Sequence, residues 1–117
     1  MQIPLQITIR GMPASEALET HIREKAMKLH EFFDHIMSCR VVVEMPHKHR
    51  HQGRQYTVHI DIGVAGSEIA VNRDHDEDVY VALRDAFDIA KRQLEEYARR
   101  LHDHHAKQHE ARRKDES

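Results

Sequence analysis

Histidines are the residues whose type and spacing could do chemistry here, because twelve of them occur in 117 residues. His47, His49 and His51 alternate along one segment, so in an extended chain their side chains would point the same way. His105 and His109 are four residues apart and would share one face of a helix. Imidazole nitrogens can bind zinc, but no cysteine or carboxylate completes a tight set of four ligands. We therefore interpret both groups as a solvated loop and tail, with metal binding as the alternative.

Basic residues are the second chemically interesting group. Three acid-to-base pairs spaced four residues apart follow the second predicted helix: Asp88–Arg92, Glu95–Arg99 and Glu96–Arg100. Pairs in this order stabilise a helix by roughly 0.2–0.5 kcal/mol each. Composition alone favours a salt-bridged, solvated helix face, and binding of these bases to phosphates is the alternative. The segment Pro46 to Gln55 adds Lys48, Arg50 and Arg54 without any acidic residue.

The sequence contains no constellation typical of an enzyme. Its four serines lack the context of a catalytic nucleophile, and no glycine-rich phosphate loop is present. Helix capping explains the carboxylates that precede Val79. We therefore predict a protein that is not an enzyme and that needs no cofactor and no small-molecule substrate.

Periodic patterns predict the elements that position these groups. Alternating apolar residues predict four strands, at Ile3–Ile9, Cys39–Met45, Tyr56–Ile62 and Ile69–Val71, with Gly63 to Gly66 forming the turn before the last. Helical spacing predicts one helix from an N-cap at Ser15 to about Asp34, and another that follows an acidic cap starting at Asp74 and runs to Leu101. Lys25 lies beside the apolar stripe of the first helix, so we expect its stem to be buried and its ammonium exposed.

The order β-α-β-β-β-α predicts an α+β fold in which two helices pack on one face of a four-stranded sheet and the other face meets water. We assign residues 1–101 to this domain and residues 102–117 to a polar, His-rich, disordered tail, because the tail has no apolar periodicity.

The amino-acid composition excludes several classes of protein. The formal net charge is −2, which argues against a protein that binds nucleic acids nonspecifically, because such proteins are basic. A single cysteine excludes an internal disulfide and suits a reducing compartment. No apolar run is long enough to span a membrane, so we expect a cytoplasmic protein without a membrane partner.

Two segments, EKAMKLHEFFDHI and DVYVALRDAFDIAKRQL, resemble the ribosome hibernation promoting factor and ribosome-associated inhibitor A family. The most specific parts are the pair Lys25 and Lys28 before Leu29, and the opening Asp78-x-Tyr80 that leads to Arg92-Gln93-Leu94. The resemblance covers about Gln2 to Leu101, in the same order of elements.

The resemblance implies binding to the small ribosomal subunit, in the channel for messenger and transfer RNA, and silencing of translation under stress or in stationary phase. Family members act by occupancy, with basic helix groups against ribosomal RNA phosphates. By position, Lys25, Lys28 and Arg92 carry that role, and Asp78 and Tyr80 shape the start of the second helix. The full set of predicted RNA-binding residues adds Lys91, Arg99, Lys48, Arg50 and Arg54.

The sequence departs from the family pattern at Ile89 and Glu96, where lysines are expected. It also ends without the C-terminal domain of long members, so we expect a short-type member or a diverged paralogue. The alternative function is that of a His-rich stress-associated or metal-binding protein that kept the fold and no longer binds ribosomes. A third possibility is an interaction module whose exposed sheet face recruits another protein.

Overall fold

The computed structural model describes residues 4–13, 15–45, 56–76 and 78–116, and within these ranges it describes side chains except at 74–76 and 103–116. The elements follow the order β1 (Leu5–Arg10), α1 (Glu16–Phe32), β2 (Ser38–Glu44), β3 (Tyr56–Val64), β4 (Ser67–Asp76) and α2 (Val79–Glu116). This order confirms the predicted β-α-β-β-β-α arrangement.

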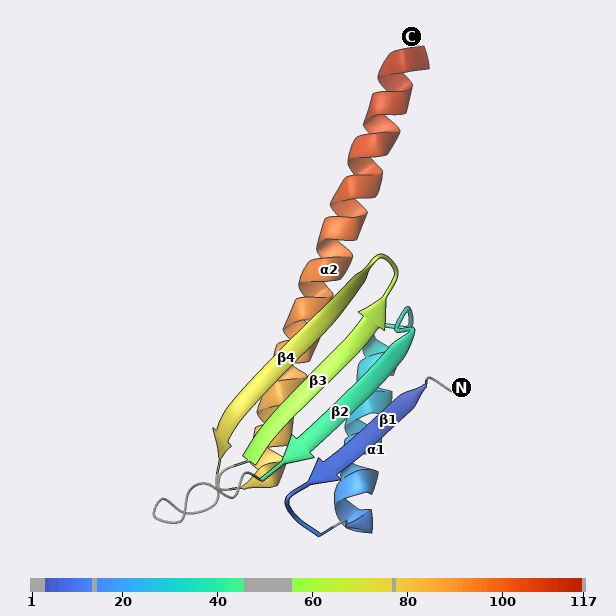
Figure 1. Cartoon of the computed structure of the whole chain (residues 1–117). Helices are drawn as coiled ribbons and strands as arrows, with labels where there is room; N and C mark the ends of the chain where they lie inside the picture. Colours follow the sequence, from blue (N-terminus) through green and yellow to red (C-terminus); the bar gives the residue numbers. More distant parts are fainter. Residues whose placement is uncertain (1–3, 14, 46–55, 77, 117) are drawn as a thin grey trace.

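The four strands form one sheet in the order β1-β2-β3-β4. β1 pairs with β2 in parallel, and α1 makes the crossover between them, whereas β2, β3 and β4 pair antiparallel. Figure 1 shows both helices behind the sheet and no helix over its other face, which we call the open face. The predicted α+β architecture is therefore confirmed.

The core lies between the sheet and the two helices, where the alternating strand positions meet the two helical stripes. Every second residue of β3 is buried, from Tyr56 to Val64, and the residues between them are only half-buried. The largest fully buried side chains are Leu18, Ile22, Ile60, Ile62, Leu83 and Leu94, together with three valines of β2 and β3. This packing fixes which flank of each helix remains in water.

The start of α1 agrees with the prediction, since Ser15 is its N-cap and its Oγ accepts a hydrogen bond from the Leu18 N–H at 3.3 Å. α2 begins at Val79, directly after the acidic run as predicted, but that run was predicted to cap the helix over too many residues. Asp74 and Asp76 belong to β4, where they pair with Thr57 and Tyr56 across a register shift. The backbone ladder to β3 extends β4 well past Val71, so the acidic run is mostly strand.

Asp78 caps α2. Its carboxylate Oδ1 accepts a hydrogen bond from the Tyr80 N–H at 2.8 Å, and its carbonyl accepts one from the Ala82 N–H at 3.1 Å. The Tyr80 ring then packs edge-on against His21 of α1, with ring centroids 4.8 Å apart. These contacts support the prediction that Asp78 and Tyr80 shape the start of the second helix.

Two other predicted boundaries differ from the structure. The turn between β3 and β4 consists only of Ala65 and Gly66, because Gly63 and Val64 still pair within the sheet, and Gly66 takes the left-handed backbone with φ 72°. α2 does not end near Leu101 but continues to Glu116, beyond the sheet (Figure 1). No glycine or proline interrupts residues 102–116, so nothing in the sequence breaks the helix there. The division into a domain and a tail at residue 101 stays a prediction.

Candidate nucleic-acid interface

A groove of about 180 Å³ lies between the exposed flanks of α1 and α2. We call it the inter-helix groove, and it is lined by Lys25, Lys28, Leu29, Phe32, Phe87, Asp88 and Lys91. Three of these side chains carry positive charge and one carries negative charge. The groove is therefore a cationic surface with an apolar floor, which suits the phosphates and bases of a nucleic acid.

The packing of α1 places two of these cations. Lys25 and Lys28 precede the buried Leu29 by one helical turn or less, so they lie at the border between core and water. Lys25 is half-buried and Lys28 is exposed, which agrees with the expected burial of the Lys25 stem. Neither lysine forms an ion pair among the residues that the structure describes.

The third cation comes from α2. Lys91 follows the buried Ala90, and its Nζ lies 4.9 Å from the centroid of the Phe32 ring. A cation over an aromatic face is attracted to the ring electrons, and this contact holds the ammonium at the groove. Phe32 remains 46% exposed, so it also offers an aromatic surface for stacking. Phe32 is not among the predicted site residues, although it stands directly before Phe33, the last apolar residue of the first stripe.

The predicted RNA-binding residues of α2 do not all lie together. Arg92 is one residue beyond Lys91, about 100° further around the helix, and it lines a different cleft of about 240 Å³ with Arg73, Asp85, Asp88 and Ile89. We call this the Arg73 cleft. Arg99 is exposed two turns further along α2 and lines neither hollow. The predicted set is thus divided between two flanks of the helix.

The predicted ion pairs along α2 are wrong. Within the ranges whose side chains are described, no ion pair joins Asp88 to Arg92, Glu95 to Arg99, or Glu96 to Arg100. These side chains are exposed to water, where pairing gains little and costs side-chain entropy. Their guanidinium groups therefore remain available to an external partner.

Arg73 was missed because the fourth strand was predicted to end before it. Ile69 and Val71 are buried, and continuing that alternation places Arg73 on the helix-covered side of β4. Its Nη2 donates a hydrogen bond to Asp85 of α2 at 3.3 Å, and Asp85 also pairs with Arg84 at 3.3 Å. The strand alternation was the signal that could have located it.

Lys48, Arg50 and Arg54 lie outside the described residues, as do the metal candidates His47, His49 and His51. The side chains of His105 and His109 also lie outside the described part. Among the side chains that are described, no group of three or more histidines, cysteines and carboxylates could hold a metal ion. In the same part of the chain, no helix is both long enough and apolar enough to cross a membrane.

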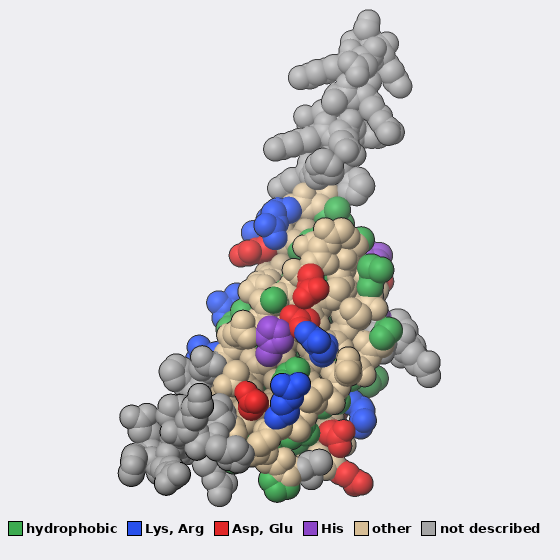
Figure 2. Space-filling view, viewed as in Figure 1, with side chains coloured by type: hydrophobic (Ala, Val, Ile, Leu, Met, Phe, Trp, Pro, Cys, Tyr) green, Lys and Arg blue, Asp and Glu red, His purple; other side chains and the backbone are tan. Residues whose placement is uncertain are grey.

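The open face of the sheet has a different electrostatic character. Figure 2 shows acidic, basic and histidine side chains next to one another on this face. Arg40 pairs with Asp61 at 2.5 Å, and the His59 ring contacts Asp61 at 2.9 Å and Asn72 at 2.5 Å. Burial alone would raise the pKa of Asp61, but the hydrogen bonds and charges of Arg40 and His59 outweigh it and lower that pKa. The charge of Asp61 is therefore satisfied by its neighbours on this face.

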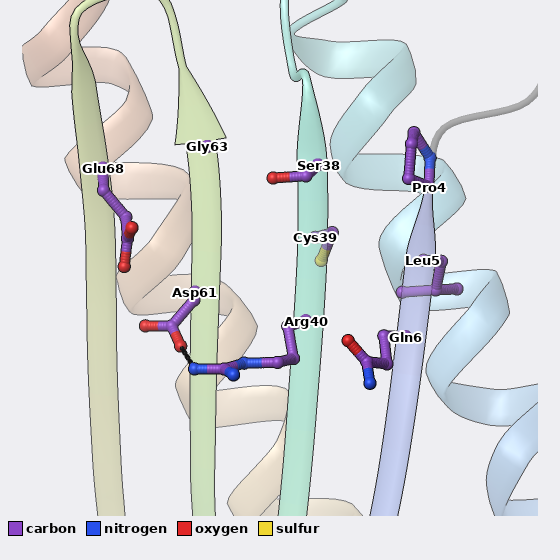
Figure 3. A pocket seen from close by; sticks show the side chains of 9 residues that line it. All are labelled: Pro4, Leu5, Gln6, Ser38, Cys39, Arg40, Asp61, Gly63 and Glu68. Carbon is purple, nitrogen blue, oxygen red and sulfur yellow. Dashed lines mark hydrogen bonds and ion pairs between the residues drawn. The ribbon is translucent and has the colours of Figure 1, made fainter.

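A shallow pocket of about 440 Å³ lies on the same face (Figure 3). Two of its lining residues, Asp61 and Glu68, are acidic, and its one cation, Arg40, is already paired with Asp61. Such a pocket repels phosphate groups. The charge balance therefore favours the helix side, rather than the open face, as the surface for nucleic acid.

Cys39 lines this pocket but is not a reactive nucleophile. Burial, together with the negative charge of Asp61, raises the pKa of the Cys39 thiol to about 11. Only the thiolate attacks disulfide reagents, and a rise of about two pKa units cuts its population near neutral pH by about 100-fold. We expect Cys39 to react with a chromogenic disulfide reagent at pH 8 at least ~100-fold more slowly in the folded protein than in urea. Equal rates in the two states, measured by absorbance, would contradict this assignment.

The sequence of this chain resembles those of known proteins. The family model described as "Sigma 54 modulation protein / S30EA ribosomal protein" matches residues 5–102. The chain is 29% identical over 100 residues to the ribosome hibernation promotion factor of Deinococcus radiodurans, covering 86% of this chain and 51% of that protein. It thus spans about half the length of that relative. It is also 32% identical over 92 residues to the ribosome hibernation promoting factor of Azotobacter vinelandii, covering 77% of this chain and 79% of that protein.

Solved structures show the same fold. A ribosomal subunit interface protein from Coxiella burnetii superposes with a TM-score of 0.70 at 19% identity, covering 82% of this chain and 98% of that one. The N-terminal domain of Thermus thermophilus Protein Y superposes with a TM-score of 0.66 at 21% identity, covering 83% and 99%. Two helices on one face of a four-stranded sheet are therefore shared across chains with little sequence in common.

Proposed function

We propose that this chain, which belongs to the Sigma 54 modulation protein / S30EA ribosomal protein family, is a ribosome hibernation factor. The names of both relatives, from Deinococcus radiodurans and Azotobacter vinelandii, support this function. The proposed partner is the small ribosomal subunit, and the proposed site is its channel for messenger and transfer RNA. A protein lodged there silences translation by occupancy, without catalysing a reaction.

The observation that carries the proposal is the charge and composition of the inter-helix groove. Lys25, Lys28 and Lys91 present three ammonium groups against one carboxylate, that of Asp88. Ammonium groups bind phosphate oxygens as point charges, and this contribution is independent of base sequence. The groove therefore matches the backbone of ribosomal RNA better than it matches a particular base sequence.

Phe32 adds an apolar contact to this cationic surface. Its ring lies at the groove, is 46% exposed and carries Lys91 over one face. An unstacked base can pack on such a ring and contribute roughly 1–3 kcal/mol. We propose that Phe32 receives a ribose or base edge while the three lysines contact the phosphates around it.

The proposed binding is electrostatic and must therefore weaken as salt is added. Each neutralised phosphate releases condensed counterions, so the affinity falls steeply between low and physiological salt.

Cosedimentation on a sucrose gradient tests the proposal directly. The tagged full chain is mixed with purified small subunits, with large subunits or with neither, at 50 mM and at 500 mM salt. We expect it to migrate with small subunits at 50 mM salt and to be released at 500 mM, because phosphate contacts dominate. Residence at the top of the gradient at both salt concentrations would rule out ribosome binding and favour the His-rich or protein-recruiting alternatives.

A further inference from the structure

We propose that the Arg73 cleft, between β4 and α2, is a second phosphate-binding site that takes one phosphate group of an RNA backbone. This inference rests on the proposed function and extends it, since the cleft lies on the flank of α2 away from the inter-helix groove. Lys91 lines the groove and the next residue, Arg92, lines the cleft. α2 would then lie between two stretches of phosphate backbone.

Two guanidinium groups converge on the cleft from different elements. Arg73 comes from β4 and Arg92 from α2, and both line the same hollow of about 240 Å³. A guanidinium group is a planar fork whose paired N–H groups match two phosphate oxygens. Two such forks at one hollow form a more specific phosphate site than lysines, which act as point charges.

Neither guanidinium is fully satisfied by the protein. Arg92 has no ion pair or side-chain hydrogen bond within the described part of the chain. The Nε of Arg73 is buried without a hydrogen-bond partner, while its Nη2 reaches Asp85 at 3.3 Å. Charged hydrogen bonds of this kind are usually about 2.7–2.9 Å long, so the contact with Asp85 is weak. A phosphate oxygen could replace it.

The carboxylates at the cleft do not cancel this attraction. Asp85 is shared by two guanidinium groups, those of Arg73 and Arg84, at 3.3 Å each, so its negative charge is divided between them. Asp88 lines both the cleft and the inter-helix groove, and it therefore lies on the crest of α2 between the two hollows. Two guanidinium groups, those of Arg73 and Arg92, and two carboxylates, those of Asp85 and Asp88, line the cleft.

The test measures the affinity of the full chain for purified small subunits over a series of salt concentrations. Arg73→Gln removes one fork, and Arg84→Gln is the matched control, because Arg84 also pairs with Asp85 but does not line the cleft. Arg73→Lys keeps the positive charge but loses the paired N–H groups of the guanidinium. It gives a second measurement of the site if Arg73→Gln does not fold. A thermal melt of each variant confirms that it is folded.

We expect Arg73→Gln to weaken binding by about 10-fold and to reduce the slope of log affinity against log salt by about 0.7–0.9, the loss of one phosphate contact. Arg73→Lys should fall between it and the unmodified chain, and Arg84→Gln should bind within ~2-fold of the unmodified chain. An unchanged affinity and slope for Arg73→Gln would overturn the second site but leave the proposed function intact. An equal loss of affinity for Arg84→Gln would also overturn the second site, because the overall positive potential of this surface would then explain both losses. If the unmodified chain does not bind, the proposed function falls, and the second site falls with it.

Discussion

The double substitution Lys25→Glu with Lys28→Glu is expected to weaken binding to small ribosomal subunits by about 1,000-fold. Each lysine is proposed to contact a phosphate, and a hydrogen bond to a charged group contributes roughly 2 kcal/mol. Losing two such contacts costs about 4 kcal/mol, which is a factor of about 1,000 in affinity. Both residues lie at the border of α1, where the charged ends stay in water. The variant should therefore remain folded.

A matched control separates local contact from overall charge. Arg10→Glu with Arg23→Glu makes the same change in net charge at two exposed positions that do not line the inter-helix groove. We expect this control to lose less than about 10-fold, because neither side chain lines the groove and salt screens the interactions of exposed charges. Affinity is measured for both variants at one fixed salt concentration, and circular dichroism checks the fold. The groove is not the contact surface if the two double variants bind equally well.

The sequence predicts the groove better than it predicts the Arg73 cleft, and the reason is local periodicity. The stripe that buries Leu29 also fixes the side of α1 on which Lys25 and Lys28 lie, so helical spacing alone placed them at the border of the core. Each of these positions depends on residues within one turn. A prediction of this kind needs no knowledge of the sheet.

The cleft depends on contacts that local patterns do not encode. Arg73 reaches Asp85 because β4 extends past Val71, and that extension depends on the ladder with β3 rather than on the helical periodicity of α2. The acidic run looked like a helix cap, and one residue of it, Asp78, is the cap. Asp74 and Asp76 were assigned to the wrong element because strand pairing overrides local propensity.

A second failure of local reasoning concerns the charge pairs of α2. Acid-to-base spacing predicts ion pairs, yet Arg92 lies at the cleft and forms none with Asp88 within the described residues. The spacing along a helix shows which charged side chains are close enough to form an ion pair. Whether the pair forms depends on how well water solvates the two charges and on the surrounding surface. The guanidinium of Arg92 is therefore one of the two groups that we propose to hold a phosphate at the Arg73 cleft.

Leu94 and Leu101 occupy equivalent positions in the apolar stripe of α2, because they are seven residues apart. Leu94 is fully buried, whereas Leu101 is 40% exposed. Tyr97 lies between them, and its hydroxyl donates a hydrogen bond at 2.6 Å to the Ala65 carbonyl in the β3–β4 turn. The helix then continues beyond the sheet (Figure 1). The two leucines therefore have unequal apolar surroundings despite their identical periodicity.

We expect Leu94→Ala to lower the free energy of unfolding by about 3 kcal/mol, since it loses buried apolar surface and leaves a cavity. For a domain of this size the melting temperature should fall by ~15 °C. Leu101→Ala is the matched control and should cost less than about 1 kcal/mol, because its side chain already meets water. Both substitutions change helix propensity equally, so propensity cancels in the comparison. Urea unfolding followed by circular dichroism gives both values. Equal losses would mean that Leu101 packs as deeply as Leu94, and that the apolar stripe of α2 stays in the core past the β3–β4 turn.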